Sequence, residues 1–428
     1  MRILVLGSGG REHAIVASLL REAPLHEITV APGNAGIAQS VTVAALDPER
    51  GDEVSQYAID NAVDLVIIGP EAPLVAGVAD ALRERGIPVF GPSRDAARIE
   101  GSKTFAKSVM DAAAVPTGGA SRAASLAEAV AAIDEYGAPY VVKADGLAAG
   151  KGVLVTGDRA EAVEHARFWL EHGPVLVEEF LVGREISLFL LSDGHTVLPL
   201  APAHDYKRAF DGDTGPNTGG MGAYSPVPWL PDGFVDEVIE TIAIPTIREL
   251  ARQRTPFIGL LYCGLILTAS GARVIEFNAR FGDPETQVVL ARLVTPLSGL
   301  LMAAASGQLG RMPRPTFTDD VAVAVVLASE GYPGEPVTGR AISGLGELAG
   351  FTGVTIAHGA TGFVAGTLVA TGGRVLSVIA TGTDFRIARG RAYGAVDRIG
   401  LAGSHFRSDI ADEVEVAVAE AGGGEVPR

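Results

Sequence analysis

Cysteine, positive charge and long apolar runs are all scarce in this 428-residue sequence. The single cysteine, Cys263, excludes an intrachain disulfide and lies in an apolar run, so we interpret it as a core residue. Lysine and arginine number 34 against 51 acidic residues, giving a formal net charge of −17. This deficit of positive charge argues against general binding to nucleic acid or to an anionic membrane surface.

No apolar run approaches the roughly 18–20 residues that a membrane-spanning helix requires. The N-terminal apolar stretch is too short for a signal peptide, because glycine and charged residues interrupt it. These absences predict a soluble protein of a reducing compartment, and we expect the cytoplasm. The oligomeric state leaves no mark in the sequence, and we expect a monomer or a weak oligomer.

Glycine, by contrast, is abundant, with 54 residues that cluster in short loops. Loops of this kind let a backbone approach a ligand closely. The chain is too long for one hydrophobic core, so several domains are expected. In residues 1–102, apolar runs such as 3–7 alternate with helical patterns such as 11–23 and 75–86, which predicts βαβ units and a parallel sheet. Residues 91–103 are interpreted as a connection to the next domain.

Beyond Lys103 the pattern changes. Residues 140–157 read as strand, glycine-rich loop and strand, and residues 175–191 and 257–280 are also strand-rich, so a second, antiparallel sheet is expected between about 120 and 280. Residues 310–320 are interpreted as a linker. The remainder, 321–428, combines strands with a helix from about Asp384, which indicates a small α+β module with a fraying C-terminal tail.

The segment GSGGREH, residues 7–13, follows the first strand and opens a helix, where backbone N–H groups can hold an anion. It is not a dinucleotide fingerprint, because Glu12 stands where the third glycine belongs and the second strand ends without an acidic residue. We therefore expect a phosphate or phosphosugar at Gly9 and Gly10, with a purely structural turn as the alternative. Asn34 and Glu71 follow the next strands and should face the same edge of the sheet.

Lys143 lies late in a strand, and the loop after it, residues 146–152, is rich in glycine. The spacing is not that of a Walker A loop, so this loop would cover phosphates with backbone amides while lysines supply the charge. The alternative is a hairpin with a solvated lysine. The acidic residues at 178, 179 and 185 come next, where the adenine and ribose of a nucleotide would need acceptors.

Two further stretches carry unusual chemistry. Residues 204–226 show no period of 2 or 3.6, and we interpret them as a long loop that lines a substrate. The stretch VIEFNARFGDPETQ begins as a strand in which Glu276, Asn278 and Arg280 alternate and would project from one face. A carboxylate and an amide oxygen together suit Mg²⁺, and a guanidinium could hold a carboxylate or phosphate in a bidentate manner.

In this order the pieces resemble the ATP-grasp ligases, and the long motifs resemble one family among them, the glycinamide ribonucleotide synthetases. The motifs are GSGGREHA, PGNAG, GPEAPL, EGSK, KADGLAAGKGV, DTGPNTGGMGAYSP and EFNARFGDPETQ. The resemblance implies an α/β and α+β multidomain fold. It comprises an N-terminal parallel βαβ (pre-ATP-grasp) domain (1–102), an ATP-grasp domain (103–310) with a flexible glycine-rich flap subdomain (about 120–190), and a small C-terminal α+β domain (321–428).

The implied activity is an ATP-dependent ligation of glycine to 5-phosphoribosylamine. It yields glycinamide ribonucleotide, ADP and phosphate through glycyl phosphate, in de novo purine (IMP) biosynthesis. The small-molecule partners are then ATP as co-substrate, glycine and phosphoribosylamine, with Mg²⁺ or Mn²⁺ as the metal. No covalent enzyme nucleophile is required, and the sequence contains no Ser/His or Cys/His set that would suggest one.

Carried over motif by motif, the resemblance implies these sites. ATP would be held by Lys103, Lys143, Gly150, Lys151, Gly152, Glu178, Glu179 and Glu185, and the metal by Glu276 and Asn278. The other two substrates would be surrounded by Gly9, Gly10, Asn34, Glu71, Thr218, Gly219, Gly220, Met221, Gly222, Asp283 and Glu285. The catalytic candidates are Arg280, Asp205 and Lys207, with Asp205 and Asp283 as candidate general bases.

Three alternatives stay open at this point: another ATP-grasp ligase or transferase of nucleotide-precursor metabolism, an NAD-dependent oxidoreductase built on the N-terminal units, and a non-catalytic nucleotide-binding module. The sequence departs from the family pattern at residues 171–174, where a longer loop is usual, which puts flap closure and nucleotide contacts there in doubt. His204 also replaces a different polar residue.

Overall fold

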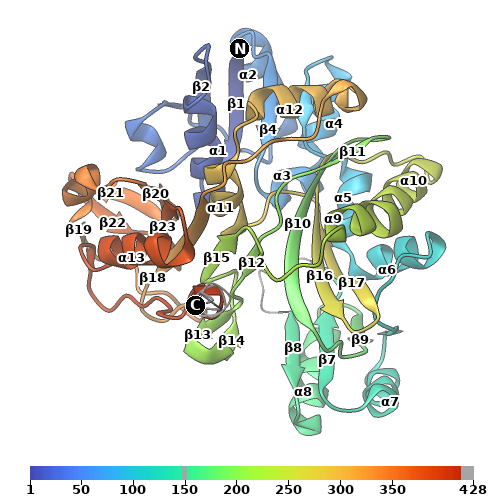
Figure 1. The fold of residues 1–428 in the computed structure, drawn as a ribbon. Helices are drawn as coiled ribbons and strands as arrows, with labels where there is room; N and C mark the ends of the chain where they lie inside the picture. The colour runs from blue at the N-terminus through green and yellow to red at the C-terminus, as the bar shows by residue number, and fades with distance from the viewer. Residues whose placement is uncertain (147–151, 416–428) are drawn as a thin grey trace, which may run out of the picture.

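The computed structural model describes residues 1–146 and 152–415. Its N-terminal domain is a parallel sheet in the order β3-β2-β1-β4-β5, at the top of Figure 1. The strands are β1 (Arg2–Gly7), β2 (Glu27–Pro32), β3 (Thr42–Val43), β4 (Leu65–Ile68) and β5 (Val89–Phe90). The strand order reverses direction beside β1, and ligands of open α/β sheets bind outside the carboxyl ends of the strands at such a point.

The helices of this domain are α1 (Gly10–Leu20), α2 (Gly51–Asp60), α3 (Glu71–Ala76) and α4 (Val78–Glu84). The predicted helix over 75–86 is wrong in one respect: Gly77, at φ +87°, separates α3 from α4, because a left-handed residue ends a right-handed helix. The predicted connection over 91–103 is helical for much of its length. It contains α5 (Arg94–Gly101), which begins where the Ser93 hydroxyl accepts a hydrogen bond from the N–H of Ala96.

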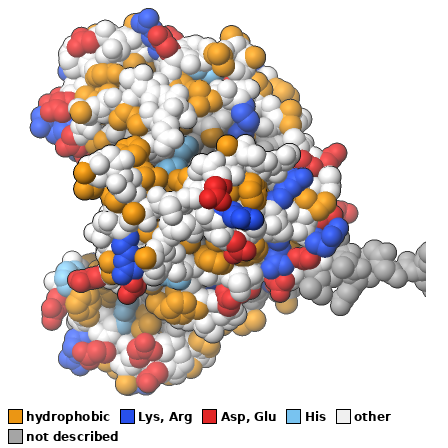
Figure 2. All heavy atoms as spheres, turned by 90° about the vertical axis from the view of Figure 1, so that its left-hand side faces the viewer, with side chains coloured by type: hydrophobic (Ala, Val, Ile, Leu, Met, Phe, Trp, Pro, Cys, Tyr) orange, Lys and Arg blue, Asp and Glu red, His pale blue; other side chains and the backbone are white. Residues whose placement is uncertain are grey.

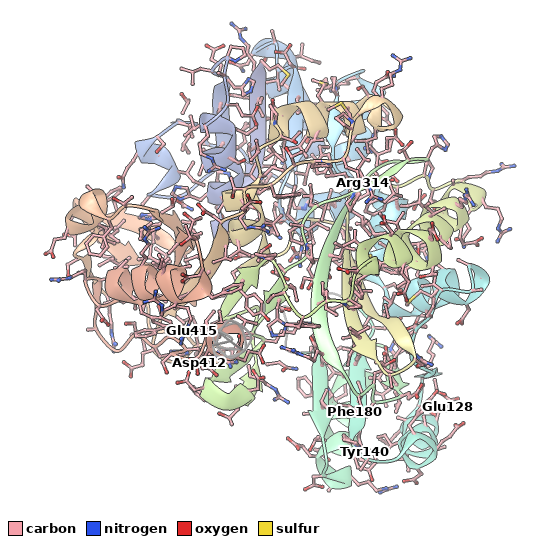
Figure 3. All side chains as sticks on the ribbon, in the orientation of Figure 1. Glu128, Tyr140, Phe180, Arg314, Asp412 and Glu415 are labelled. Atoms are coloured by element: carbon pink, nitrogen blue, oxygen red, sulfur yellow. The ribbon has the colours of Figure 1, made fainter. Side chains whose placement is uncertain are left out.

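Two antiparallel sheets, not one, occupy the region predicted between 120 and 280. The flap sheet, β6-β9-β7-β8, lies at the bottom of Figure 1 with its covering helices. Its elements are β6 (Ala120–Ala123), α7 (Leu126–Tyr136), β7 (Tyr140–Ala144), β8 (Val153–Thr156), α8 (Arg159–Leu170) and β9 (Val175–Glu178). Figure 3 labels Glu128, which caps α7, and Tyr140, which starts β7, in this lobe.

The second antiparallel sheet, β11-β10-β16-β17, lies above the flap sheet. Its strands are β10 (Arg184–Asp193), β11 (Val197–Pro199), β16 (Ile258–Thr268) and β17 (Gly271–Asn278). Around it lie α6 (Lys103–Ala112), α9 (Phe234–Val238), a π-helical turn (Ile239–Ala243), α10 (Ile244–Arg252) and α12 (Leu297–Ala305), whereas α11 (Glu285–Arg292) packs against α1. Cys263 is buried in β16, as predicted.

The third antiparallel sheet, β12-β15-β18-β23-β20, forms the left side of Figure 1. Its strands are β12 (His204–Asp205), β15 (Gly222–Ser225), β18 (Val321–Ala328), β20 (Val354–His358) and β23 (Arg374–Gly382), with α13 (Phe385–Val396) packed on it. Short pairs β21 (Thr361–Val364) with β22 (Thr367–Ala370) and β19 (Ile342–Ser343) with β24 (Gly400–Leu401) complete this part. The predicted helix start holds, because the Asp384 carboxylate caps α13. The predicted tail 421–428 lies outside the described residues.

The expectation of an unstructured loop over 204–226 is wrong. Glycine turns hide its periodicity, but the backbone forms β12 and β15, which join the C-terminal sheet, and the hairpin of β13 (Arg208–Phe210) with β14 (Thr214–Asn217). Strand β18 is buried along its whole length. Ala322 and Ala324 pack in the core shared with the N-terminal domain, whereas Val323 packs in the core beneath α13. The C-terminal sheet is therefore docked against the N-terminal domain.

No described helix is long and apolar enough to cross a membrane. Acidic and basic side chains are interspersed over the face shown in Figure 2, so the excess of negative charge is not gathered into one large patch there.

Candidate active site

A cavity of about 410 Å³ lies at the carboxyl edge of the N-terminal sheet. The start of α1 forms one wall through Ser8, Gly9 and Gly10, and Gly33 and Asn34 form another. A methyl group added at Gly10 would lie 3.0 Å from the Gln287 amide nitrogen, so this turn fits closely against α11. The N–H groups at the start of an eleven-residue helix favour an anion at this position.

The opposite wall comes from the C-terminal domain, which contributes residues that we did not predict from the sequence. They are Gly359, Ala360, Thr361, Thr371, Arg374, Leu376 and Ser377. The Arg374 guanidinium donates from Nη1 to Asp283 O and Gly219 O, and its Nη2 lies 3.4 Å from Asp283 Oδ2. The sequence around Arg374, GGRVLSVIATG, contains no local feature that assigns a role to the arginine.

The side chain of Asn34 lies at the cavity, but its hydrogen bonds are all made to backbone groups of the protein. Its Nδ2 donates to Ser8 O at 2.8 Å and to His358 O at 2.7 Å, and its Oδ1 accepts from the N–H groups of Gly36 and Ile37. Two donors and two acceptances are the full capacity of an amide. Asn34 therefore shapes the cavity by holding the backbone around it.

The glycines of the predicted loop 218–222 lie against the turn at Asp283. Gly220 has φ +112°, and a methyl group on it would lie 2.4 Å from the Pro284 ring. The Thr218 hydroxyl donates to Lys207 O and accepts from the Gly220 N–H. Further along, Met221 is fully buried, and Gly222 begins β15 against Ile410. The end of this predicted substrate loop thus packs in the protein interior.

A buried ion cluster joins the flap sheet to α6. Lys143, 4% exposed, donates from Nζ to Glu178 Oε2 at 2.9 Å and to Ile275 O at 3.3 Å. The same Glu178 oxygen lies 3.4 Å from Nζ of Lys107. Burial alone would raise the pKa of Glu178, but Lys143 and Lys107 lower it. Glu178 therefore positions two lysines, a role that the sequence did not predict.

Three other predicted nucleotide residues surround this cluster. Lys103, at the start of α6, donates to Gly146 O at 3.1 Å, and burial lowers its pKa. Glu179 accepts the N–H of Gly119 at 3.0 Å and is exposed. Gly152 is described and buried, whereas Gly150 and Lys151 lie outside the described residues.

Glu185, at the start of β10, forms an ion pair with Lys207 at 2.7 Å, which lowers the pKa of the carboxyl. Burial opposes the charge on Lys207, but Asp205 and Glu185 raise its pKa well above the usual value. The structure thus joins the predicted ribose acceptor to a predicted catalytic residue.

Glu276 and Asn278 share one face of β17, as predicted, because they are two residues apart, and a bulge decides which face it is. Gly264 pairs with Glu276 while the next residue, Leu265, pairs with Val274, so Ile275 is an extra residue. The bulge shifts the alternation, sending Phe277 into the core and Glu276 to the opposite face. Without it, Glu276 would follow Val274 inward.

This pair fits a hard divalent cation. Among the described residues, the Glu276 carboxylate forms no hydrogen bond or ion pair. The Asn278 side chain can donate from its NH₂ group to Glu100 Oε1 at 3.3 Å. In that orientation the amide oxygen faces away from the Glu100 carboxylate. The described residues contain no group of three or more His, Cys, Asp or Glu side chains placed to hold a metal. The donor set is thus one carboxylate and one amide oxygen, as for Mg²⁺ sites that are completed by phosphate and water.

Arg280 lies just beyond β17 in an acidic setting. Its Nη2 is 2.9 Å from Glu100 and its Nε is 3.2 Å from Glu71, while Nη1 donates to Phe281 O. These carboxylates raise the pKa of Arg280 against the effect of its burial. Burial would raise the pKa of Glu71, but Arg280 lowers it. The predicted anion holder is thus paired with Glu71, a predicted substrate residue.

Asp205 and Glu285 meet at one hydroxyl. Ser187 Oγ lies 3.3 Å from Asp205 Oδ1, 3.1 Å from Glu285 Oε1 and 2.8 Å from the Tyr262 hydroxyl. All four residues are at least nine-tenths buried. Burial and the neighbouring Asp205 raise the pKa of Glu285 to about 7, and burial raises the pKa of Asp205. Ser187 and Tyr262 carry no motif signal and were not predicted.

The pKa of Asp283 is lowered, whereas that of Asp205 is raised. It accepts a hydrogen bond from Gln287 Nε2 at 2.7 Å, and Arg374 lowers its pKa despite burial. Of the two candidate general bases, Asp205 is therefore the one whose environment favours taking up a proton.

Family models match the chain in three consecutive parts. They are described as the N domain (residues 1–100), the ATP-grasp (A) domain (101–286) and the C domain (322–413) of phosphoribosylglycinamide synthetase. The phosphoribosylamine–glycine ligase of Leifsonia xyli is 68% identical over 96% of this chain and 99% of its own length. That of Streptomyces coelicolor is 56% identical, over 96% and 99%. The crystal structure of the Thermotoga maritima phosphoribosylamine–glycine ligase superimposes with a TM-score of 0.82, at 32% identity, covering 96% of this chain and all of that one.

Proposed function

The chain belongs to the phosphoribosylglycinamide synthetase family and is an ATP-dependent phosphoribosylamine–glycine ligase of purine biosynthesis, and from this premise we propose how its residues divide the reaction. One observation supports the division: the run from Glu276 to Glu285 begins next to Ile275, whose carbonyl oxygen accepts from Lys143, and reaches the cavity where Asp283 pairs with Arg374. The nucleotide and the phosphosugar would thus lie on opposite sides of this run, with glycine between them.

The phosphoribosyl group of phosphoribosylamine occupies the cavity. Its phosphate lies at the start of α1, against Gly9 and Gly10, where helix N–H groups favour an anion. Arg374 supplies the positive charge from the opposite wall. The glycines of loop 218–222 and Asp283 then hold the cavity in shape, since both contact the Arg374 side chain.

ATP lies over Lys103 and Lys143, with Glu185 as the acceptor for its ribose and Glu179 near the adenine. The Lys143 ammonium group is well placed to bind phosphates. Glu178 fixes its position, and it stays next to β17 through its hydrogen bond to Ile275 O. Glu276 and Asn278 would hold Mg²⁺ or Mn²⁺, which would supply positive charge to neutralise the phosphoryl oxygens. Gly152 would lie near the phosphates, and the predicted roles of Gly150 and Lys151 fall on residues outside the described part of the chain.

Glycine is activated first. An oxygen of its carboxylate attacks the γ-phosphorus of ATP, the bond to ADP breaks, and glycyl phosphate results. Arg280 holds the reacting oxygens, and to do so it exchanges its contact with Glu71 for the substrate. The amine of phosphoribosylamine then attacks the acyl carbon and phosphate leaves. Asp205, next to Lys207 and Glu285, receives the proton that the amine loses.

We also propose the domain limits 1–102, 103–310 and 321–428. Strands β12 and β15 lie within 103–310 in the sequence but belong to the sheet of the C-terminal domain. The partners are ATP, glycine and phosphoribosylamine, without nucleic acid or membrane. We further propose a cytoplasmic location and a monomer or weak oligomer.

Substrate dependence tests the assignment. ADP should form rapidly only when glycine and phosphoribosylamine are both present, whereas glycine alone should support at most slow turnover, because acyl phosphate then has no amine acceptor. A coupled ADP assay with each substrate omitted in turn measures this. ATP cleavage that responds to neither compound would refute the assignment.

Replacing Arg374 by methionine should raise the KM for phosphoribosylamine by about tenfold or more, since a charge-assisted hydrogen bond to phosphate contributes roughly 1.5–3 kcal/mol. The KM for ATP should change less than about twofold, because a nucleotide site on the far side of the 276–285 run does not use this side chain. Initial rates with each substrate varied measure both. Equal increases in the two constants would show a general distortion instead.

A further inference from the structure

The backbone of His358, the last residue of β20, is held on both sides by the N-terminal domain. Its N–H donates to Nδ1 of His13 at 2.9 Å, and its carbonyl oxygen accepts from Asn34 Nδ2 at 2.7 Å. Among the described strands, β20 lies at the edge of its sheet and pairs with β23, so its outward N–H groups need acceptors from elsewhere. A helix side chain, His13 of α1, supplies one.

The contact leads directly to the cavity wall. Residues 359–361 follow His358 and line the cavity together with the start of α1, three residues before His13. The His358 ring lies 3.1 Å from the Thr361 hydroxyl through Nδ1. A methyl group added at Gly36 would lie 2.2 Å from the His358 ring, so the strand end fits closely against the N-terminal domain.

The geometry also defines the state of the His13 ring. Because Nδ1 accepts a hydrogen bond, it carries no proton, and the neutral ring bears its hydrogen on Nε2. The two imidazoles stack with centroids 5.5 Å apart at 30°. Burial, and for His13 also the proximity of His358, lower the pKa of both rings to about 4. A proton on Nδ1 would face the His358 N–H and break the bond.

We propose that His13 is a positioning residue for phosphoribosylamine: the neutral Nδ1 holds the backbone of His358 and thereby places residues 359–361 against the phosphoribosyl group. This inference rests on the proposed use of the cavity by that substrate. Asn34 alone cannot perform the task, since it fixes only the carbonyl side and leaves the N–H without a partner. His13 itself touches no reacting atom.

Two replacements of His13 separate its hydrogen bond from its bulk. His13→Ala removes the acceptor, whereas His13→Asn keeps an oxygen acceptor close to the place of Nδ1 and does not titrate. His13→Ala should raise the KM for phosphoribosylamine by about 3–10-fold, the usual effect of one lost hydrogen bond, and leave the KM for ATP and glycine within about twofold. His13→Asn should restore the KM for phosphoribosylamine to within about twofold of the parent. His26→Asn is the matched control, because His26 precedes β2 at the opposite edge of the same sheet.

Binding of ribose 5-phosphate, measured by calorimetry, provides a readout that does not depend on turnover. Its Kd should follow the same order, weakened in His13→Ala and restored in His13→Asn. An unchanged Kd and KM in His13→Ala would overturn the inference, and so would a failure of His13→Asn to rescue a correctly folded protein. If the parent binds no ribose 5-phosphate yet forms ADP in response to both substrates, the placement of the phosphosugar is wrong although the activity stands.

Stability against pH provides a second test. The pKa values of His13 and His358 are about 4 in the folded protein, below the ordinary value of 6.5. Between pH 4 and 6.5 the two rings are therefore protonated in the unfolded chain but not in the folded protein. Stability from these rings is therefore complete above about pH 6.5, is lost as pH falls toward 4, and changes no further below. The titratable group that stacks on His13 is the His358 ring of β20. The charged groups on α1 and α11, the elements packed around it, already have partners. Arg11 pairs with Glu12 on α1, and Asp283, just before α11, accepts from Gln287.

His13→Asn should accordingly reduce the slope of the unfolding free energy against pH in this window by up to one proton. Urea titrations at several pH values measure the slope. A slope identical to that of the parent would mean that the folded His13 ring is not held neutral, contrary to the inference.

Discussion

Alanine in place of Glu276 should lower kcat by at least about 10²-fold, because losing a metal ligand removes several kcal/mol of transition-state stabilisation. The bulge at Ile275 turns this carboxylate away from the core, and no described side chain is bonded to it. The protein should fold normally, since the substitution breaks no ion pair among the described residues. Steady-state rates at saturating ATP, glycine and phosphoribosylamine measure the effect.

The metal dependence makes the Glu276 experiment specific. In Glu276→Ala the concentration of Mg²⁺ or Mn²⁺ that gives half-maximal rate should rise, and higher metal should recover part of the activity. Glu240→Ala, an exposed acid of the π-helical turn, is the matched control and should behave like the parent. Near-normal activity of Glu276→Ala at low metal would refute the metal role.

Methionine in place of Lys143 should raise the KM for ATP and lower kcat/KM by at least about 10²-fold, because a positioned charge at the phosphates acts in a poorly hydrated setting. It should also destabilise the fold by roughly 3–5 kcal/mol, since the buried Glu178 then keeps only the longer contact with Lys107. Kinetics with ATP varied and urea denaturation measure the two effects.

A double variant separates the two consequences of removing Lys143. Lys143→Met combined with Glu178→Gln removes the uncompensated carboxylate, so much of the lost stability should return. ATP use should stay impaired, because the phosphates still lack the lysine. Recovery of ATP kinetics together with stability would mean that Lys143 serves the fold and not the nucleotide.

Several structural features could be predicted from the sequence because they depend on local patterns of residues. The helix start at Gly9 and Gly10 and the two paired strands on either side of the glycine-rich segment follow from chain order, and both are confirmed. The pairing of Glu276 with Asn278 on one face was also correct, although simple alternation would have sent Glu276 toward the side of Val274.

Other roles depend on partners distant in the chain. The Glu178 carboxylate is bonded to Lys143 and Lys107, and the Asn34 amide makes four hydrogen bonds within the protein. Neither set of partners is visible in the sequence around the residue. Arg374 was missed because its significance comes from Asp283 and Gly219, which lie 91 and 155 positions away.

By itself the sequence determined the parallel N-terminal sheet, the glycine-rich flap strands, the family and the chemistry of the side chains, because periodicity, turn residues and motifs are local properties. Only the tertiary structure decided which of those side chains are already satisfied. It placed the C-terminal wall opposite α1 and brought His13 to the edge of β20, 345 positions away. Hydrogen-bond capacity and burial depend on every neighbour in space, and the order of residues along the chain does not record those neighbours.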